Sequence, residues 1–362
     1  MRIGFDGKRA VQNFTGLGNY SRYVADILCH FYPENDYVLY APKKRENKRM
    51  NLLTGQYRQL TLAYPATSFW KKLSSLWRVW GITSQLEKEG IELFHGLSNE
   101  LPLNIHKSRI KSIVTIHDLI FLRYPQYYQS IDRKIYTYKF RKACENADKI
   151  IAISECTKRD IIRYFNIPDD KIEVVYQGCD VSFTHPVTEE KKEEVRKKYQ
   201  LPDHYILNVG SIEERKNILA AVQALPMLPQ HIHIVIVGRR TGYTEKVEQF
   251  IKDNGLGERV HIISNVPFND LPAFYQSAEI FVYPSRFEGF GIPIIEALYS
   301  GIPVVAATGS CLEEAGGPDS IYVNPDDITG LADAFKQIYS NSDKRKNMVE
   351  KGREFAKRFS EK

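Results

Sequence analysis

Two acidic residues, Glu288 and Glu296, stand on either side of a glycine-rich turn with seven residues between them. Gly289 and Gly291 form that turn, and Pro293 follows where a helix would begin. The unpaired N–H groups of a first helical turn favour an anion. Carboxylates beside an anion site suggest that hydroxyl groups are bound there too. A phosphate that carries a sugar offers both kinds of group.

The two carboxylates lie in a segment whose pattern predicts strand, turn, helix and strand. Ile280–Tyr283 is an apolar run typical of a buried strand, and Ile302–Ala306 is a second such run. Apolar residues carry a helix between them, and Ser300-Gly301 ends it. The first helical turn then faces whatever lies above the sheet. The alternative is a surface loop whose two acidic residues are solvated.

A basic pair follows another expected strand. Tyr205–Val209 is apolar, and Gly210 begins a turn that leads through Arg215 and Lys216 into a helix. Two cations are unfavourable at the positive end of a helix unless an anion is held there. The alternative is a solvated basic pair.

The first half of the chain offers two weaker signals. The strand at residues 2–7 leads to a glycine turn, Gly16 and Gly18, which opens a helix through about His30. His117 follows the strand Ile113–Ile116, at the strand end where α/β proteins bind ligands. A histidine at such a place can equally be a hydrogen-bonded structural residue.

Size and composition indicate a globular protein of about two domains. The chain has 362 residues, of which 43% are hydrophobic and 26% charged. Its five cysteines are scattered and form no C-x-x-C pair, which favours a reduced, cytoplasmic compartment. We expect neither a signal peptide nor a membrane-spanning segment.

The positive charge is concentrated in the first half. Residues 1–180 hold 28 Lys and Arg against 19 Asp and Glu, whereas residues 181–362 hold 22 against 25. A basic face can attract nucleic acid, anionic lipid or a phosphorylated substrate, or can simply be solvated. Residues 69–80 contain Trp70, Trp77 and Trp80 at helical spacing. We interpret them as a core-facing helix; an interfacial helix at a membrane is the alternative.

The segment Tyr283–Ala306 resembles the E-x7-E signature of retaining glycosyltransferases of family GT4, most of all bacterial mannosyltransferases. The resemblance covers nearly the whole chain and is most specific at residues 210–217 and 283–306. It implies that Glu288 lies beside the donor sugar with His117, that Glu296 binds the ribose, and that Arg215 and Lys216 neutralise the diphosphate. Further donor-binding positions implied by it are Gly16, Gly18, Gly210, Gly238, Val266, Phe290 and Gly291.

The resemblance also implies the architecture. We expect the α/β GT-B fold, in which two doubly wound, Rossmann-like domains face each other across a cleft. Residues 1–180 would form the acceptor-side domain and residues 181–342 the domain that binds the nucleotide-sugar. The last helix, in residues 343–362, packs back towards the first domain in this family, and we expect that crossing element to be shortened or lost here.

The reaction implied is retaining transfer of a hexose, with mannose favoured, from GDP- or UDP-hexose to a glycan or lipid-linked glycan. No cofactor and no metal are expected, since the sequence has no Asp-x-Asp motif. Nucleic acid is not an expected partner, and the location would be the cytoplasm, with peripheral contact at the inner face of the membrane. Two alternatives stay open: a GT-B epimerase or phosphorylase, and a non-catalytic protein that binds nucleotide-sugars.

Overall fold

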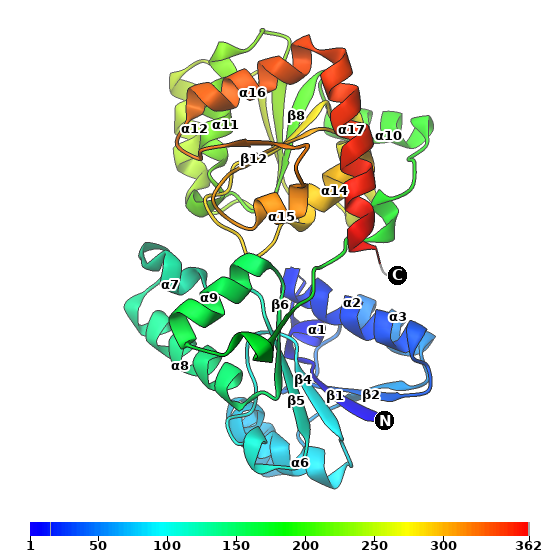
Figure 1. The fold of residues 1–362 in the computed structure, drawn as a ribbon. Helices are drawn as coiled ribbons and strands as arrows, with labels where there is room; N and C mark the ends of the chain where they lie inside the picture. The colour runs from blue at the N-terminus through cyan, green and yellow to red at the C-terminus, as the bar shows by residue number, and fades with distance from the viewer. Residues whose placement is uncertain (15, 361–362) are drawn as a thin grey trace. The chain divides into compact units, whose positions relative to one another are not determined.

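The computed structural model describes residues 1–14 and 16–360. They form two compact units, residues 1–176 and residues 177–362, and each unit is described by itself below. Figure 1 follows the chain through both units by colour from blue to red. Both are parallel sheets with helices between successive strands, so the prediction of two doubly wound domains is confirmed.

The first unit is built on a sheet of seven parallel strands in the order β3-β2-β1-β4-β5-β6-β7 among the described residues. The strands are β1 (Arg2–Asp6), β2 (Asp36–Tyr40), β3 (Leu60–Ala63), β4 (Leu93–Gly96), β5 (Lys111–Ile116), β6 (Lys149–Ala152) and β7 (Ile172–Val174). Val38 and Tyr40 belong to one apolar cluster, and Tyr37 and Leu39 belong to another. Because neighbouring strand residues point to opposite faces, the sheet is buried on both sides.

The helices of the first unit connect these strands. They are α1 (Lys8–Gln12), α2 (Gly16–Phe31), α3 (Lys48–Gln56), α4 (Ser68–Lys72), α5 (Ser74–Leu76), α6 (Ile82–Lys88), α7 (Ile120–Arg123), α8 (Ser130–Asn146) and α9 (Glu155–Phe165). The single helix expected over residues 69–80 is wrong, because it is interrupted at Leu73 and continues as a π-helix, η1 (Trp77–Gly81). The φ and ψ of Leu73, −105° and 42°, are not helical.

The second unit is built on six parallel strands in the order β10-β9-β8-β11-β12-β13 within the described chain. They are β8 (Tyr205–Val209), β9 (His233–Val237), β10 (Val260–Ile263), β11 (Ile280–Tyr283), β12 (Val304–Ala307) and β13 (Ile321–Val323). Every pairing is parallel, so the carboxyl ends of all six strands lie at one edge of the sheet. The predicted site residues of this unit follow four of those ends.

Helices cover both faces of this second sheet. They are α10 (Glu189–Tyr199), α11 (Ile218–Ala224), α12 (Thr244–Asp253), α13 (Leu271–Ser277), α14 (Ile292–Ser300), α15 (Leu312–Gly316), α16 (Ile328–Ser340) and α17 (Ser342–Ala356). Helices α11 and α16 pack together in one layer, and α14 packs with α13 and α17 in the other (Figure 1). Because α17 packs on α14, α15 and α16, it belongs to the second unit. A return of the last residues to the first unit stays a prediction.

Candidate functional site

The carboxylate of Glu288 is held in the turn between β11 and α14. Its Oε1 accepts hydrogen bonds from the hydroxyls of Ser285, at 3.0 Å, and Tyr283, at 3.2 Å. Tyr283 is the last residue of β11, so a buried strand end supports the carboxylate directly. Only 14% of the Glu288 side chain is exposed.

Both predicted cations meet this carboxylate. They come from the 3₁₀ turn Glu214–Lys216, which follows β8. Nη1 of Arg215 lies 2.8 Å from Glu288 Oε2, and Nζ of Lys216 lies 3.6 Å from Oε1. Lys216 also donates to the Tyr283 hydroxyl at 3.2 Å. We call Arg215, Lys216, Tyr283, Ser285 and Glu288 the Glu288 cluster.

The opposite charges in the Glu288 cluster favour each other's ionised form. Burial raises the pKa of Glu288, but Lys216 and Arg215 outweigh it and hold that pKa below its usual value. Burial likewise lowers the pKa of Lys216, and the charge of Glu288 raises it above its usual range. All three groups are therefore ionised at neutral pH. Glu213 also lies 3.8 Å from Nη2 of Arg215 and 3.6 Å from Nη2 of Arg239. Three cations thus face two carboxylates, which leaves an excess of positive charge that can attract an anion.

The start of α14 lies next to this cluster in the chain. Gly291 is its N-cap residue, and no side chain caps the first turn. A Cβ at Gly291 would lie 2.9 Å from Cβ of Ala315, so close packing on α15 favours glycine there. Phe290 is buried against the ring of Phe359, and the thiol of Cys311 donates to the carbonyls of Glu288 and Phe290. The turn is thus fixed by packing before any ligand arrives.

Glu296 stands apart from the Glu288 cluster. It lies one turn into α14, is half-buried, and accepts a hydrogen bond of 2.7 Å at Oε2 from the hydroxyl of Tyr275 in α13. Burial raises its pKa to about 7, and the charge of Asp180 adds to that rise. A carboxyl group with this pKa changes its charge near neutral pH. Once ionised, it can accept hydrogen bonds from hydroxyl groups.

Three predicted loop positions gather at the ends of β8, β9 and β10. The amide of Gly210 donates to Val237, and the amide of Gly238 donates to Ile263, both at 2.9 Å. A Cβ at Gly238 would lie 1.8 Å from the carbonyl oxygen of Gly210, so the two loops can touch only with glycine at that position. Val266 follows β10 and is half-buried. Roles for these residues in donor binding stay predictions.

His117 lies in the first unit, just after β5, and is buried. Its backbone N–H donates to Asn99 Oδ1 at 2.7 Å, and its Nε2 lies 2.9 Å from the carbonyl oxygen of Leu97. Because a carbonyl only accepts, Nε2 carries the proton and Nδ1 is the nitrogen able to accept one. Burial lowers the pKa of His117 to about 4, so the ring is neutral at pH 7.

A polar chain beside His117 was not predicted from the sequence. His95, in β4, lies 2.8 Å through Nε2 from the Thr115 hydroxyl, which is 3.1 Å from the hydroxyl of Tyr20. The Tyr20 ring meets His117 edge to face at 4.7 Å. Burial lowers the pKa of His95 to about 3. The signal was present, since His95 and Thr115 are polar residues near the carboxyl ends of two apolar strands.

The glycines of the first unit lie inside a helix rather than before it. Helix α2 begins at Gly16, so the expected glycine turn is wrong in detail. A Cβ at Gly18 would lie 2.0 Å from the carbonyl oxygen of Asn13, whereas one at Gly16 would meet nothing within 4 Å. Packing therefore demands glycine at Gly18 only. Tyr20, in the next turn, connects α2 to His117.

The described residues contain neither a candidate metal site nor a candidate membrane-spanning helix. No group of three or more His, Cys, Asp or Glu in residues 1–14 and 16–360 could hold a metal ion. No helix within those same ranges is both long enough and apolar enough to cross a bilayer.

Comparison with known protein families shows that the chain is a glycosyltransferase. The family model for "Glycosyl transferases group 1" matches residues 189–355, and that for "Glycosyltransferase Family 4" matches residues 21–183. The chain belongs to glycosyltransferase family 4.

Particular relatives include two curated bacterial enzymes. The chain is 31% identical over 274 residues to O-antigen chain mannosyltransferase B of Escherichia coli, covering 74% of this chain and 70% of the relative. It is 29% identical over 225 residues to O-antigen chain mannosyltransferase RfbU of Salmonella typhimurium, covering 62% of this chain and 60% of the relative.

Solved structures share the fold. Sucrose-phosphate synthase from Thermosynechococcus elongatus superposes with a TM-score of 0.78 at 20% identity, covering 99% of this chain and 94% of the other. HepE of Anabaena, solved with UDP and glucose, gives a TM-score of 0.76 at 17% identity over 99% and 94%. The GT-B fold predicted from the sequence is thereby confirmed.

Proposed function

We propose that this glycosyltransferase moves a hexose, with mannose the first candidate, from a nucleotide diphosphate sugar to a hydroxyl group, with the anomeric configuration retained. The observation that carries the proposal is the ion-paired contact of Arg215 and Lys216 with Glu288 at the strand ends of the second unit. Arg215 and Lys216 would supply positive charge for the diphosphate, and Glu288, which contacts both, would supply a carboxylate for the sugar.

The departing diphosphate is the group that needs stabilising. Negative charge grows on it as the glycosidic bond breaks, so fixed positive groups favour the transition state over the ground state. Arg215, Lys216 and the amides around Phe290 and Gly291 supply that charge in the proposal. With these groups in place the transfer needs no divalent metal and no cofactor.

Glu288 orients the sugar rather than attacking it. Its Oε1 accepts from Ser285 and Tyr283, and its Oε2 is paired with Arg215. Both oxygens are thus engaged, and a carboxylate held by cations is a weak nucleophile. This arrangement favours attack by the acceptor hydroxyl on the same face that the diphosphate leaves, without a covalent enzyme intermediate.

Glu296 and His117 complete the proposed donor contacts. An ionised Glu296 would accept hydrogen bonds from ribose hydroxyls. A neutral His117 donates through Nε2 to the carbonyl of Leu97 and would accept a hydrogen bond from a sugar hydroxyl at Nδ1. Gly16, Gly18, Gly210, Gly238 and Val266 would let backbone approach the donor.

The relatives guide the choice of substrate. Two of them are named as O-antigen chain mannosyltransferases, which supports a mannosyl donor and a role in surface polysaccharide synthesis. We propose GDP- or UDP-hexose as donor and a glycan or lipid-linked glycan as acceptor. The reaction then takes place in the cytoplasm, with peripheral contact at an anionic membrane, and nucleic acid is not a partner.

The test begins with binding and ends with stereochemistry. The thermal stability of the full chain is measured with GDP-mannose, UDP-glucose and ADP-glucose; a ligand at a hundred times its Kd adds about 2.7 kcal/mol. The stabilising donor is then incubated with acceptors, and the anomeric configuration of the product is read by NMR. An inverted product would overturn the retaining mechanism, and stabilisation by none of the donors would overturn the proposal itself.

A further inference from the structure

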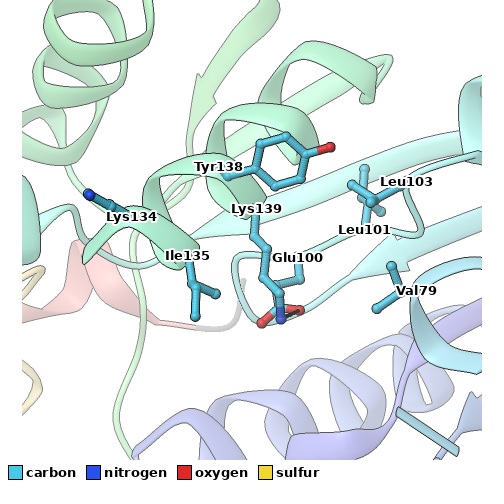
Figure 2. A pocket seen from close by; sticks show the side chains of 8 residues that line it. All are labelled: Val79, Glu100, Leu101, Leu103, Lys134, Ile135, Tyr138 and Lys139. Carbon is cyan, nitrogen blue, oxygen red and sulfur yellow. Dashed lines mark hydrogen bonds and ion pairs between the residues drawn. The ribbon is translucent and has the colours of Figure 1, made fainter. Parts of the chain in front are cut away.

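Two half-buried carboxylates outside the Glu288 cluster have contrasting partners. Glu100 lines a pocket of about 310 Å³ in the first unit, and its Oε2 lies 2.7 Å from Nη1 of Arg78 and 3.4 Å from Nζ of Lys139 (Figure 2 shows it beside Lys139). Glu296, in the second unit, instead receives a hydrogen bond of 2.7 Å at Oε2 from the hydroxyl of Tyr275. A carboxylate between two cations is already neutralised, whereas a carboxylate held by a neutral hydroxyl keeps its charge for a ligand.

The hydroxyl of Tyr275 is held in place through its ring. Tyr275 lies in α13 and is fully buried. Its ring stacks on that of Phe281 in β11 with the centroids 5.3 Å apart, and it meets the ring of Phe183 edge to face at the same distance. Both of these neighbours are fully buried as well. Because a close-packed ring cannot change rotamer without displacing its neighbours, the hydroxyl has a fixed position beside α14.

Tyr275 remains a hydrogen-bond donor throughout the neutral pH range. Burial raises its pKa well above the usual value, and the charge of Glu296 adds to that rise. A protonated tyrosine hydroxyl has one hydrogen to donate, and here Oε2 of Glu296 accepts it. The contact fixes one oxygen of the carboxylate and leaves the other, Oε1, for hydroxyl groups of a ligand.

Other titratable groups act on this contact from neighbouring segments. Burial raises the pKa of Glu296 and the charge of Asp180 raises it further, whereas the hydrogen bond from Tyr275 lowers it. Cys179 and Tyr283 have pKa values raised by burial, so both are uncharged at neutral pH. On α17, a guanidinium group packs at the far end of α14, against its C-cap glycine. Tyr275 thus favours the ionised carboxylate against burial and Asp180.

We propose that Tyr275 is a positioning residue for nucleotide binding, whose hydroxyl fixes Oε2 of Glu296 so that Oε1 faces the ribose hydroxyls. Because Tyr275 is fully buried, it acts through Glu296 and makes no contact with the nucleotide. The inference rests on the proposed function, in which Glu296 binds the ribose. A packing role is different, because packing does not depend on the charge of Glu296, whereas a hydrogen bond to a carboxylate is strongest when the carboxylate is ionised.

Tyr275→Phe removes the hydroxyl and retains the ring. Calorimetric titrations of the full chain with GDP and with UDP give the Kd at pH 7 and at pH 9. For the nucleotide that binds the wild type, the Kd of the variant should rise about tenfold at pH 7. The difference should shrink at pH 9, where Glu296 is ionised in both proteins. A loss of affinity that is equal at the two pH values would make Tyr275 a packing residue and overturn the proposal.

A double variant shows whether the effect passes through the carboxylate. Glutamine at position 296 has no charge for the hydroxyl to stabilise, so adding Tyr275→Phe to Glu296→Gln should change the Kd by about twofold at most. A further tenfold loss in the double variant would mean that Tyr275 acts on the nucleotide by another route. That result would overturn the assignment.

Tyr205→Phe is the matched control. Tyr205 is also fully buried in the second unit, and its hydroxyl donates to the carbonyl of Phe274 in α13 at 2.7 Å. The control therefore loses a hydroxyl and a hydrogen bond of the same length but leaves Glu296 unchanged. Its nucleotide Kd should equal that of the wild type at both pH values. If the control loses as much affinity as Tyr275→Phe, disturbance of α13 explains both results and the proposal is wrong.

A measurement without nucleotide separates this inference from the proposed function. Urea midpoints are compared at pH 5.5, where the carboxyl group of Glu296 is protonated, and at pH 8.5, where it is ionised. Tyr275→Phe should lose more stability at pH 8.5, and Tyr205→Phe should lose the same at both values. Equal losses in Tyr275→Phe would overturn the inference even if the nucleotide binds. A chain that shows the unequal loss but binds neither GDP nor UDP would overturn the proposed function, and with it the nucleotide-binding role of Tyr275.

Discussion

Nη1 of Arg215 lies 2.8 Å from Oε2 of Glu288 and also donates to the carbonyl of Phe287. The loop after β8 and the loop after β11 are therefore held together by one guanidinium group. Before a donor binds, the cation that we assign to the diphosphate is shared with the carboxylate that we assign to the sugar. Substitutions in this pair should separate donor binding from catalysis.

Replacing Glu288 should impair transfer more than donor binding. In Glu288→Gln the positive charges of Arg215 and Lys216 lose the counter-charge of Glu288, so the donor Kd should stay equal or fall. The oriented carboxylate is lost, and we expect kcat to fall by about 10²-fold, as for removal of one group that supports a transition state. Steady-state kinetics and calorimetric titration with the donor measure the two effects. Full transfer activity in this variant would contradict the role of Glu288.

Glu288→Ala should also destabilise the second unit. Arg215 and Lys216 have side chains that are only 15% and 18% exposed, and the truncation removes the carboxylate that both contact, leaving Arg215 with only the longer 3.8 Å pair to Glu213. Breaking a buried pair in this way costs about 3 kcal/mol. Glu288→Gln retains hydrogen-bonding atoms and should lose less. Urea denaturation of both variants gives the comparison, and equal stability of the two would contradict this account.

Removing either cation should weaken donor binding. Arg215→Met or Lys216→Met removes a charge-assisted contact with the diphosphate, worth about 1.5–3 kcal/mol, or roughly ten- to a hundredfold in Kd. Lys336→Met is the control, because Lys336 is an exposed residue of α16 paired with Asp333. Calorimetry with the nucleoside diphosphate alone suffices. If the control loses as much affinity as the two variants, the diphosphate does not bind at Arg215 and Lys216.

Much of this arrangement could be predicted from the sequence because it depends on short-range patterns. Apolar runs predicted β8 and β11 with the bounds that the structure shows. The helix cap at Ser154 is another local feature, since its hydroxyl accepts from the Thr157 amide at 3.0 Å. Such features depend on a few neighbouring residues only.

Features that depend on distant contacts could not be predicted. His95 and Thr115 are visible in the sequence as polar residues at strand ends, but their contact with each other and with Tyr20 depends on the pairing of β4 with β5 and on the packing of α2, which the sequence does not give. The contact of the Gly238 position with Gly210 is likewise a packing contact between loops. The helix break at Leu73 could not be predicted either, because no glycine or proline lies next to it in the sequence.

Donor binding should depend on pH through Glu296. Burial raises the pKa of Glu296 to about 7 from 4.5, so the folded protein holds a proton that the unfolded chain releases. This group's contribution to stability is present below pH 4.5 and is lost as the pH rises through 7. Ribose hydroxyls prefer the ionised carboxylate, so the Kd of the nucleotide should fall as the pH rises from 6 to 8. Calorimetry at both values tests this, and an equal pH dependence in Glu296→Gln would contradict it.

Acid should weaken the first unit through its two buried histidines. Burial lowers the pKa of His117 to about 4 and that of His95 to about 3, both from 6.5. Between these pH values the two histidines bind protons in the unfolded chain but not in the folded protein. The free energy of unfolding should therefore fall as the pH drops from 6.5 towards 4. Because His117 stays neutral down to that range, transfer should show no titration of His117 between pH 6 and 8.

His117→Gln separates the two roles of this residue. Glutamine can still donate to the Leu97 carbonyl but does not titrate, so the loss of stability between pH 7 and pH 5 should shrink, while His30→Gln, at an exposed position of α2, should leave it unchanged. Urea midpoints at both pH values give this comparison. We expect kcat of His117→Gln to fall about tenfold or more if Nδ1 accepts a sugar hydroxyl. A variant that keeps wild-type kcat but loses the acid sensitivity would make His117 a structural residue and leave the sugar to Glu288.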